Sequence, residues 1–590
     1  MRTLVLLGLF ISALATAQTN TYHISFDNAD HHEAKVNITF PELKSNSVIV
    51  RMSRTSPGRY ALHEFAKNVY GFKATNSQGE PLKFERPDPY SWKVSDHDGT
   101  INIEYILFAN RGDGTYSQID ETHAHLNIPA TFMYAEEFEH RPVTVNFDVR
   151  EDLNWKVATQ LKEESGTTYS APDLYYFMDS PTEISDFNVK EFDLDGQSIR
   201  FVLHHEGTEE QFSEYFEQVK RIVEQEKAVY GELPEFDYDE YTFLACYMPN
   251  VSGDGMEHRN STILTDTESL AEGGMKGNIG TVAHEFFHAW NVERIRPDEL
   301  EPFDFAEANM TGSLWFAEGF TSYYTGLMLC RANVISPEDY IKGLSGTFNY
   351  VWNSPALQYF NPIEMSYQAP FVDAATSVDP VNRENTFVSY YSYGSVLGLA
   401  LDLALRQQGL NLDDFMKLMW LKYGKTEVAY QIEDIEETLK EYAGEKFATE
   451  FFSKHIYDSK RPDYQKLFES TGMKLAQEEE KVYFGASLRA TEDGLEIVRN
   501  TFKSSPAYKA GLDSGDIIIS IDGNKVTTLE GFKSILENNE NGIVKVVFKR
   551  FENERETEVS LEADPSFSIS IDEKASQEAL KNRKNWLEAK

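Results

Sequence analysis

The segment His284-Glu285-Phe286-Phe287-His288 contains residues whose types and spacing suit metal-dependent hydrolysis. Residues four apart lie on the same face of a helix, so both imidazoles can bind one Zn²⁺ at about 2.0–2.1 Å. Glu285 is rotated by about 100° from His284, so its carboxylate can reach a water at the metal rather than the metal itself. We therefore expect a helix that carries two zinc ligands and a general base.

A catalytic zinc needs a third protein ligand and an open fourth position. Glu318 is the candidate, because it lies in a second helical stretch, Leu314–Tyr324, whose other side chains are mostly apolar or aromatic. A carboxylate in such surroundings needs a partner, and a metal ion is one. The alternative is an ordinary solvated glutamate. We expect one Zn²⁺ per chain, held by His284, His288 and Glu318.

These motifs resemble those of a known peptidase family. HEFFH followed by AEGFTSYY is similar to the thermolysin-like zinc peptidases, whose third ligand is a Glu on a second helix. The longer phrases HEFFHAWNVERIRPDEL, LWFAEGFTSYY and SPGRYALHEFAKNVYGF resemble the glycyl aminopeptidase family that carries a PDZ domain. The resemblance covers nearly all of the chain after residue 17. It implies a zinc aminopeptidase that acts on peptides and favours N-terminal Gly or Ala.

The segment Gly255–His258 resembles the Gly-x-Met-Glu-Asn motif of zinc aminopeptidases, in which an edge strand carries the glutamate. A free α-amino group is cationic near neutral pH, so a carboxylate fixed near the zinc can anchor it and limit cleavage to the first residue. The resemblance implies this substrate-binding role for Glu257, with Gly255, Met256 and His258 beside it. The alternatives are a loop carboxylate for Glu257 and simple packing for His258.

The segment Ser389–Gly394 resembles the Tyr-Tyr-x-Lys-Gly motif of the same family, in which a tyrosine hydroxyl faces the zinc. By register Tyr391 is the match, and Tyr390 is a weaker candidate. A phenol beside the zinc would stabilise the negative charge that peptide hydrolysis builds on the carbonyl oxygen. Tyr393 stands where the family usually has lysine, so any role of that lysine is in doubt. The alternative is that all three tyrosines are core aromatics.

A C-terminal segment resembles a PDZ domain. Its signals are a glycine-containing loop before a predicted strand and the later phrases Gly515-Asp516-Ile517-Ile518 and Ile521-Asp522-Gly523. The resemblance implies that this loop receives the C-terminal carboxylate of a peptide beside a strand edge. The alternative is a structural cap with an empty or blocked groove. The loop residues are Phe484, Gly485, Ala486 and Ser487.

The elements that must position these residues change in type along the chain. Residues 18–168 contain β-rich runs, several with period-two alternation, separated by turn clusters. Residues 169–475 first mix strands and helices and then become helical, whereas strands return in residues 476–563. Residues 564–590 form a charged tail. We expect a multidomain α+β protein: an N-terminal β domain, a thermolysin-like catalytic domain that is mixed α/β and then helical, and a PDZ-like domain.

Composition limits the classes of partner. The 590 residues include 96 acidic and 55 basic side chains, a net charge of −41, so the chain repels phosphate backbones and nucleic acid is not an expected partner. A hydrophobic share of 41% allows large cores and excludes a disordered chain. Cys246 and Cys330 exclude a disulfide scaffold and a Cys-rich zinc module. We expect buried free thiols, with a disulfide between them as the alternative.

Met1–Ala17 has the pattern of a secretory signal peptide. Arg2 precedes an apolar run from Leu4 to Leu14, and Ala15-Thr16-Ala17 is a small-x-small cleavage site. The alternative is an anchor helix, but the apolar core is short for about 30 Å of hydrocarbon. We expect cleavage before Gln18, export to the periplasm or beyond, and no membrane span in the mature protein.

The sequence thus favours an exported zinc aminopeptidase, and two alternatives stay open. One is a zinc endopeptidase with substrates guided by the PDZ domain, and the other is a PDZ peptide-binding protein with an inactive peptidase domain. The sequence leaves the oligomeric state open. The pair His123 and His125 is predicted to be structural, because no third ligand lies near it in the sequence.

Overall fold

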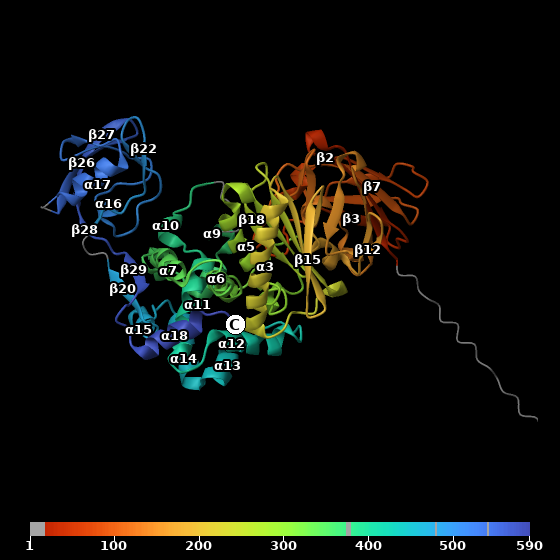
Figure 1. The fold of residues 1–590 in the computed structure, drawn as a ribbon. Coiled ribbons are helices and arrows are strands. Elements are labelled where there is room, and N and C mark those ends of the chain that lie inside the picture. The colour runs from red at the N-terminus through yellow and green to blue at the C-terminus, as the bar shows by residue number, and fades with distance from the viewer. Residues whose placement is uncertain (1–17, 373–378, 478–480, 540–541) are drawn as a thin grey trace, which may run out of the picture. The chain divides into compact units, whose positions relative to one another are not determined.

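The computed structural model describes residues 18–372, 379–477, 481–539 and 542–590, and the predicted signal peptide lies outside these ranges. By internal contacts the chain divides into two units. Among the described residues, unit 1 contains residues 18–57, His63–Val189 and Val202–His204, and unit 2 contains Gly58–Leu62, Lys190–Phe201 and the described residues from His205 to Lys590. Figure 1 labels the helices and strands of both units.

Unit 1 is built mainly from antiparallel strands. Its largest sheet has seven strands in the order β12-β13-β10-β1-β2-β7-β4, with one parallel pair, β1 and β10. Buried and more exposed residues alternate along β2 and β7, as expected for strands with one face on a core. The strands are β1 (Asn20–Asn28), β2 (Glu33–Phe40), β4 (Val69–Thr75), β7 (Ile101–Phe108), β10 (Val143–Asp148), β12 (Lys162–Ser165) and β13 (Thr168–Ala171).

Two smaller sheets complete unit 1. A three-stranded sheet has the order β3-β6-β5, and a four-stranded sheet has the order β11-β14-β9-β8. Every residue of β9 and β14 is buried, so these two strands are covered on both faces. The strands are β3 (Ser47–Arg51), β5 (Lys83–Glu85), β6 (Ser91–Ser95), β8 (Gln118–Ile119), β9 (His123–Leu126), β11 (Lys156–Thr159) and β14 (Thr182–Ser185).

A five-stranded mixed sheet and the long helix α3 (Glu209–Tyr230) precede the helical part of unit 2. The strand order is β15-β16-β17-β19-β18, which leaves β18 at an edge. Thr208 and Gln211 form a capping box at the start of α3, and Gly231, with φ +87°, ends it. The strands are β15 (Asn188–Leu194), β16 (Gln197–His205), β17 (Glu240–Tyr247), β18 (Asp254–His258) and β19 (Ser261–Asp266).

Helices dominate the rest of the catalytic region. The helices α5 (Ile279–Phe287), α6 (Leu314–Arg331) and α11 (Tyr390–Arg406) carry the predicted site residues, and α5 packs beside α3 (Figure 1). Cys246 and Cys330 are both buried, and in the described part of the chain they form no disulfide. Further helices of this region are α7 (Pro337–Trp352), α12 (Leu412–Met419), α13 (Ile432–Ala443), α14 (Glu445–His455) and α15 (Tyr464–Glu469).

The PDZ-like region has its own sheet and core. Its sheet has the order β22-β23-β24-β26-β27, and α17 (Leu529–Glu537) contributes the buried side chains Phe532 and Leu536 to its core. The pair β21 and β28 lies outside that sheet. The strands are β21 (Val482–Tyr483), β22 (Leu488–Ala490), β23 (Leu495–Ile497), β24 (Ile517–Ile521), β26 (Ile543–Arg550), β27 (Asn553–Ser560) and β28 (Glu562–Ala563).

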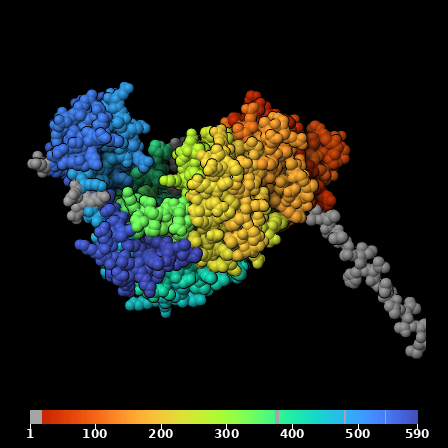
Figure 2. Space-filling model, in the orientation of Figure 1, coloured from red at the N-terminus to blue at the C-terminus, as the bar shows by residue number. Residues whose placement is uncertain are grey.

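The C-terminal tail is folded. Strand β29 (Phe567–Ile571) pairs with β20 (Met473–Gln477), and α18 (Gln577–Leu587) follows. The backbone amide of Lys590 donates to Gln225 of α3 at 2.8 Å, and Figure 2 shows the darkest blue atoms bordering the yellow ones. The described part of the chain contains no helix with the length and apolar character that a membrane span requires.

Candidate active site

The structure brings the three predicted metal ligands together. The Nε2 atoms of His284 and His288 lie 3.5 Å and 3.2 Å from one oxygen of Glu318, Oε2. Donors at about 2 Å from one tetrahedral zinc lie roughly 3.3 Å apart, so this spacing fits a single ion. The side chains of His288 and Glu318 are almost fully buried, whereas that of His284 is 18% exposed.

Hydrogen bonds hold both imidazoles with Nε2 toward Glu318. The Nδ1 atom of His288 lies 2.6 Å from the carbonyl oxygen of Asn291, and that of His284 lies 3.2 Å from Oγ1 of Thr325. An imidazole that donates through Nδ1 keeps the lone pair of Nε2 for a metal. The side-chain amide of Asn291 donates to the carbonyl oxygen of Ala317 at 3.0 Å, which ties the chain after α5 to α6.

The electrostatics favour a charged carboxylate on Glu318 and a neutral imidazole on His284, whereas they act the other way on His288. Burial acts to raise the pKa of Glu318, but His288 and His284 outweigh it and hold this pKa well below its ordinary value. Burial lowers the pKa of His284, which favours the neutral form that ligates zinc. Burial also acts to lower the pKa of His288, but the nearby carboxylates of Glu318 and Glu257 outweigh it and raise this pKa well above its ordinary value.

Glu285 lies next to the ligands and against an edge strand. Its pKa is raised well above the ordinary value, first by burial and then by Glu257 and Glu318, while His288 opposes the shift. A Cβ atom on Gly255 of β18 would lie 2.1 Å from Oε1 of Glu285. Strand β18 can therefore approach α5 this closely because residue 255 has no side chain.

Glu257 lies on β18, an edge strand, and not in a loop. It is buried, and its carboxylate, that of Glu285 and a nitrogen of His288 lie within 4.8 Å of one another. Burial and the nearby Glu318 raise its pKa, and His288 opposes them. Met256 and His258 are buried on the same strand, and a Cβ atom on Gly58 would lie 2.2 Å from the sulfur of Met256.

Tyr391 lies beside the metal ligands at the start of α11. The centres of the Tyr391 and His284 rings are 5.9 Å apart, and Tyr390 stacks on Tyr391 at 4.7 Å. Burial, with a contribution from Glu318, raises the pKa of Tyr391 well above its ordinary value, so the hydroxyl keeps its proton. Tyr393 instead lines a small cavity with Ser459 and Arg461, and burial raises its pKa to about 12.

Three residues of the site come from a segment to which the sequence assigned no role. The Tyr60 hydroxyl donates to Oε1 of Glu318 at 2.9 Å, and Arg59 pairs with Asp254 of β18. A Cβ atom on Gly58, whose φ is +79°, would lie 2.9 Å from Oε2 of Glu257. These residues belong to the segment SPGRYALHEFAKNVYGF. The resemblance of that segment to the family was the one feature of the sequence that could have indicated their role.

Family models match three parts of the chain. Residues 21–186 match the Peptidase M61 N-terminal domain, residues 277–397 match M61 glycyl aminopeptidase, and residues 503–550 match a PDZ domain. The chain is a metallopeptidase. The resemblance to the PDZ-containing glycyl aminopeptidase family is confirmed at the level of these domains, and the predicted multidomain fold is confirmed with it.

A solved structure resembles the peptidase over nearly all of its length. The aminopeptidase N family protein from Idiomarina loihiensis is 25% identical, with a TM-score of 0.85, and the match covers 96% of this chain and 100% of that one. An M1 zinc metallopeptidase from Deinococcus radiodurans is 11% identical, with a TM-score of 0.42, covering 76% and 95% of the two chains. A search of curated proteins found no match.

The PDZ domain of the peptidase has a groove at the predicted loop. A cavity of about 390 Å³ is lined by Phe484–Ser487 and by Phe532 and Leu536 of α17. Gly485 has φ +83°, and a Cβ atom there would lie 2.3 Å from Cβ of Ser505, so the loop requires glycine at this point. The groove has space for a peptide between the loop and the helix.

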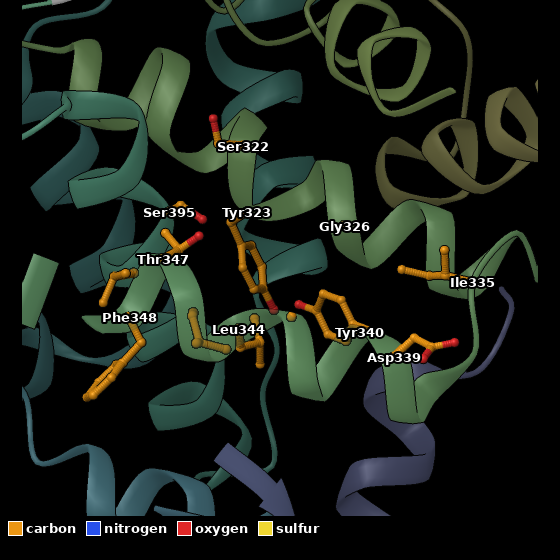
Figure 3. A pocket seen from close by; sticks show the side chains of 13 residues that line it. Ser322, Tyr323, Gly326, Ile335, Asp339, Tyr340, Leu344, Thr347, Phe348 and Ser395 are labelled. Carbon is orange, nitrogen blue, oxygen red and sulfur yellow. The ribbon is translucent and has the colours of Figure 1, made fainter. Parts of the chain in front are cut away.

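A further cavity of the peptidase lies away from the metal ligands. Its volume is about 220 Å³, and helices α6, α7 and α11 supply most of its lining. Figure 3 shows Tyr323 and Tyr340 in this cavity with their hydroxyl groups turned toward each other. The lining residues that the structure describes include none of the predicted metal, catalytic or substrate-binding residues.

Proposed function

We propose that this metallopeptidase is a zinc aminopeptidase that removes small N-terminal residues, Gly or Ala, from peptides. The position of Glu257 carries the proposal, because a buried carboxylate beside Glu285 and His288 can anchor a substrate α-ammonium group at the scissile bond. Such an anchor makes a free N-terminus part of the substrate. The family description, M61 glycyl aminopeptidase, supports the preference for a small first residue.

The protein's ligand set fits one catalytic zinc. His284 and His288 would bind it through Nε2 and Glu318 through Oε2, since these atoms already face one another. Zinc held there would supply a Lewis acid for the scissile carbonyl and would lower the pKa of a water to about 7. The hydrogen bond from Tyr60 would orient the Glu318 carboxylate for this role.

The side chains around the ligands supply the other catalytic roles, which are proton transfer, stabilisation of the carbonyl oxygen and binding of the substrate amine. Glu285 takes the proton of the attacking water and returns it to the leaving amine as the peptide C–N bond breaks. The Tyr391 hydroxyl donates a hydrogen bond to the carbonyl oxygen as negative charge builds there. Glu257 holds the α-ammonium group and so fixes which bond lies at the metal.

Matched substrates test the aminopeptidase proposal. Gly- and Ala-4-nitroanilide should be hydrolysed faster than the Leu compound, and their N-acetyl forms should react at least about 100-fold more slowly than the free amines. Glu257→Gln should raise KM for the free-amine substrates about 10–100-fold, because one charge-assisted contact is lost. Rapid cleavage of an acetylated substrate by the wild type would favour the endopeptidase alternative and remove the anchor role of Glu257.

We also propose that the PDZ groove binds peptide C-termini. The cavity beside Phe484–Ser487 supports this role, since PDZ domains add a peptide strand and hold its carboxylate on a backbone loop. A fluorescent peptide with an apolar C-terminal residue should bind the full chain, and its C-terminal amide should bind at least about tenfold more weakly. If the peptide and its C-terminal amide bind equally well, the groove does not recognise a carboxylate, and the PDZ domain is a structural cap.

Export is proposed from the sequence of Met1–Ala17. The charged residue, the apolar run and the small-x-small site support it. Expression of the full gene in a bacterial host should give a protein that begins at Gln18 in the periplasm or medium. Retention of Met1 on protein recovered from the cytoplasm would contradict the proposal.

A further inference from the structure

Unit 1 contains a second cluster of metal-ligating side chains, made by His123 of β9, Glu183 of β14 and His204 of β16. The Nδ1 atoms of His123 and His204 lie 3.4 Å and 3.6 Å from one oxygen of Glu183, Oε1. All three side chains are buried, with exposures of 0%, 1% and 6% for His123, Glu183 and His204. Two imidazoles and one carboxylate therefore meet inside the unit.

This cluster repeats the geometry of the candidate active site. There, two imidazole nitrogens lie 3.5 Å and 3.2 Å from one oxygen of Glu318. The donor types are the same, and the separations match those of ligands that share one tetrahedral ion, roughly 3.3 Å. We propose that His123, Glu183 and His204 bind a second divalent transition-metal ion, zinc by the chemistry of the donors. The chain would then hold two ions, whereas the sequence alone predicts one.

The two oxygens of Glu183 show why a metal explains the cluster better than hydrogen bonds do. Oε2 lies 3.0 Å from Nδ1 of His125, an ordinary hydrogen-bond distance. Oε1 points between His123 and His204 and accepts no hydrogen bond within the described part of the chain. A buried carboxylate oxygen without a donor is costly, and a cation bound to it removes that cost.

The surrounding groups suit an ion in this place. The carboxylate of Asp120 lies 3.8 Å from Nε2 of His123, on the side of the ring opposite Glu183, as in carboxylate–histidine–metal arrangements. Nε2 of His125 lies 3.0 Å from the carbonyl oxygen of Asp113, so both ring nitrogens of His125 face acceptors and hold Glu183 in place.

The burial of the donors assigns the ion a structural role. It would join β9, β14 and the Val202–His204 segment of β16, which are far apart in the sequence. The sequence predicts a structural role for His123 and His125, but in the structure the second imidazole at Oε1 of Glu183 belongs to His204. No local spacing could show this, because His204 is distant in the chain.

Metal counting tests the proposal on the full chain. By inductively coupled plasma mass spectrometry, zinc-reconstituted wild type should hold two ions, and Glu183→Gln should hold one. His288→Ala should also hold one, because it removes the catalytic ligand and leaves the cluster intact. His97→Asn is the control: its imidazole accepts from the Gly99 amide in the same unit, so this variant should keep two ions.

Two results would overturn the proposal: one ion per chain in the wild type, or two ions in Glu183→Gln. If Glu183→Gln does not fold, the number of ions bound to His288→Ala tests the proposal. One bound ion would support a metal site at the cluster, and the absence of any bound ion would contradict it. Calorimetric titration of metal-free His288→Ala with Zn²⁺ gives an independent measure. The proposal predicts one binding event per chain, and no binding would contradict it.

Discussion

In the proposed mechanism Glu285 handles protons at the metal without being a ligand, so its replacement should separate metal binding from turnover. Glu285→Gln keeps the size of the side chain but cannot accept the proton of the attacking water. We expect kcat to fall about 10²–10⁴-fold with an unchanged zinc content. Steady-state kinetics and metal analysis on the same sample check this result. Substantial activity in the variant would show that another group is the base.

Tyr391 is assigned the stabilisation of charge on the carbonyl oxygen, a contact made mainly in the transition state. Tyr391→Phe should lower kcat about 10²–10³-fold and change KM little. Tyr393→Phe is the matched control, because Tyr393 lies on the same helix but lines another cavity with Ser459 and Arg461. If both variants keep wild-type kcat, the tyrosines are core aromatics, as the alternative interpretation holds.

At the scale of elements, a close crossing of α6 and α11 places Glu318 beside Tyr391. A Cβ atom on Gly319 would lie 2.3 Å from Cα of Gly394, and one on Gly394 would lie 1.9 Å from the carbonyl oxygen of Trp315. Both contacts are with backbone atoms, which cannot turn away as a side chain can. Glycine is therefore required on each helix at this crossing.

Gly319→Ala should separate the two helices and disturb the site. We expect it to lower the free energy of unfolding by about 1–3 kcal/mol and to lower kcat. Gly346→Ala is the control, since a Cβ atom on that glycine of α7 meets nothing within 4 Å. The control should be neutral or more stable by up to about 1 kcal/mol. Denaturant unfolding measures both, and equal stability of the two variants would contradict the tight crossing.

The site residues differ in how well local sequence could predict them. The helix with His284 and His288 follows from a spacing of four, and Glu318 follows from a carboxylate in an apolar helix. Tyr60 has no such signal, because its bond to Glu318 joins segments far apart in the chain. The close approach of Gly255 to Glu285 is likewise a tertiary contact, although the resemblance had already selected Gly255.

At the scale of the molecule, the C-terminal tail is part of the catalytic unit. Trp586 of α18 is fully buried, its indole N–H donates to the Tyr323 hydroxyl at 2.9 Å, and its carbonyl oxygen accepts from Arg331 of α6. A composition-based prediction of a charged tail could not show this, since one tryptophan among charged residues has no local pattern. The tail therefore supports the helix that carries Glu318.

Removal of the Trp586 side chain should destabilise the helical region. Trp586→Ala should cost about 3–5 kcal/mol, because it leaves a cavity and removes the donor to Tyr323. Lys581→Ala is the control on the same helix, at an exposed position, and should change stability by less than about 0.5 kcal/mol. Thermal unfolding of the two variants checks this, and equal melting temperatures would show that the tail does not stabilise the unit.

The most direct test of the zinc aminopeptidase mechanism is the hydrolysis of Ala-4-nitroanilide and its N-acetyl form by the full chain, before chelation, after it and after return of Zn²⁺. We predict rapid hydrolysis of the free-amine substrate, loss of activity on chelation and recovery with zinc. The acetylated substrate should react at least about 100-fold more slowly. Hydrolysis that survives complete metal removal, or equal rates for the two substrates, would contradict the mechanism.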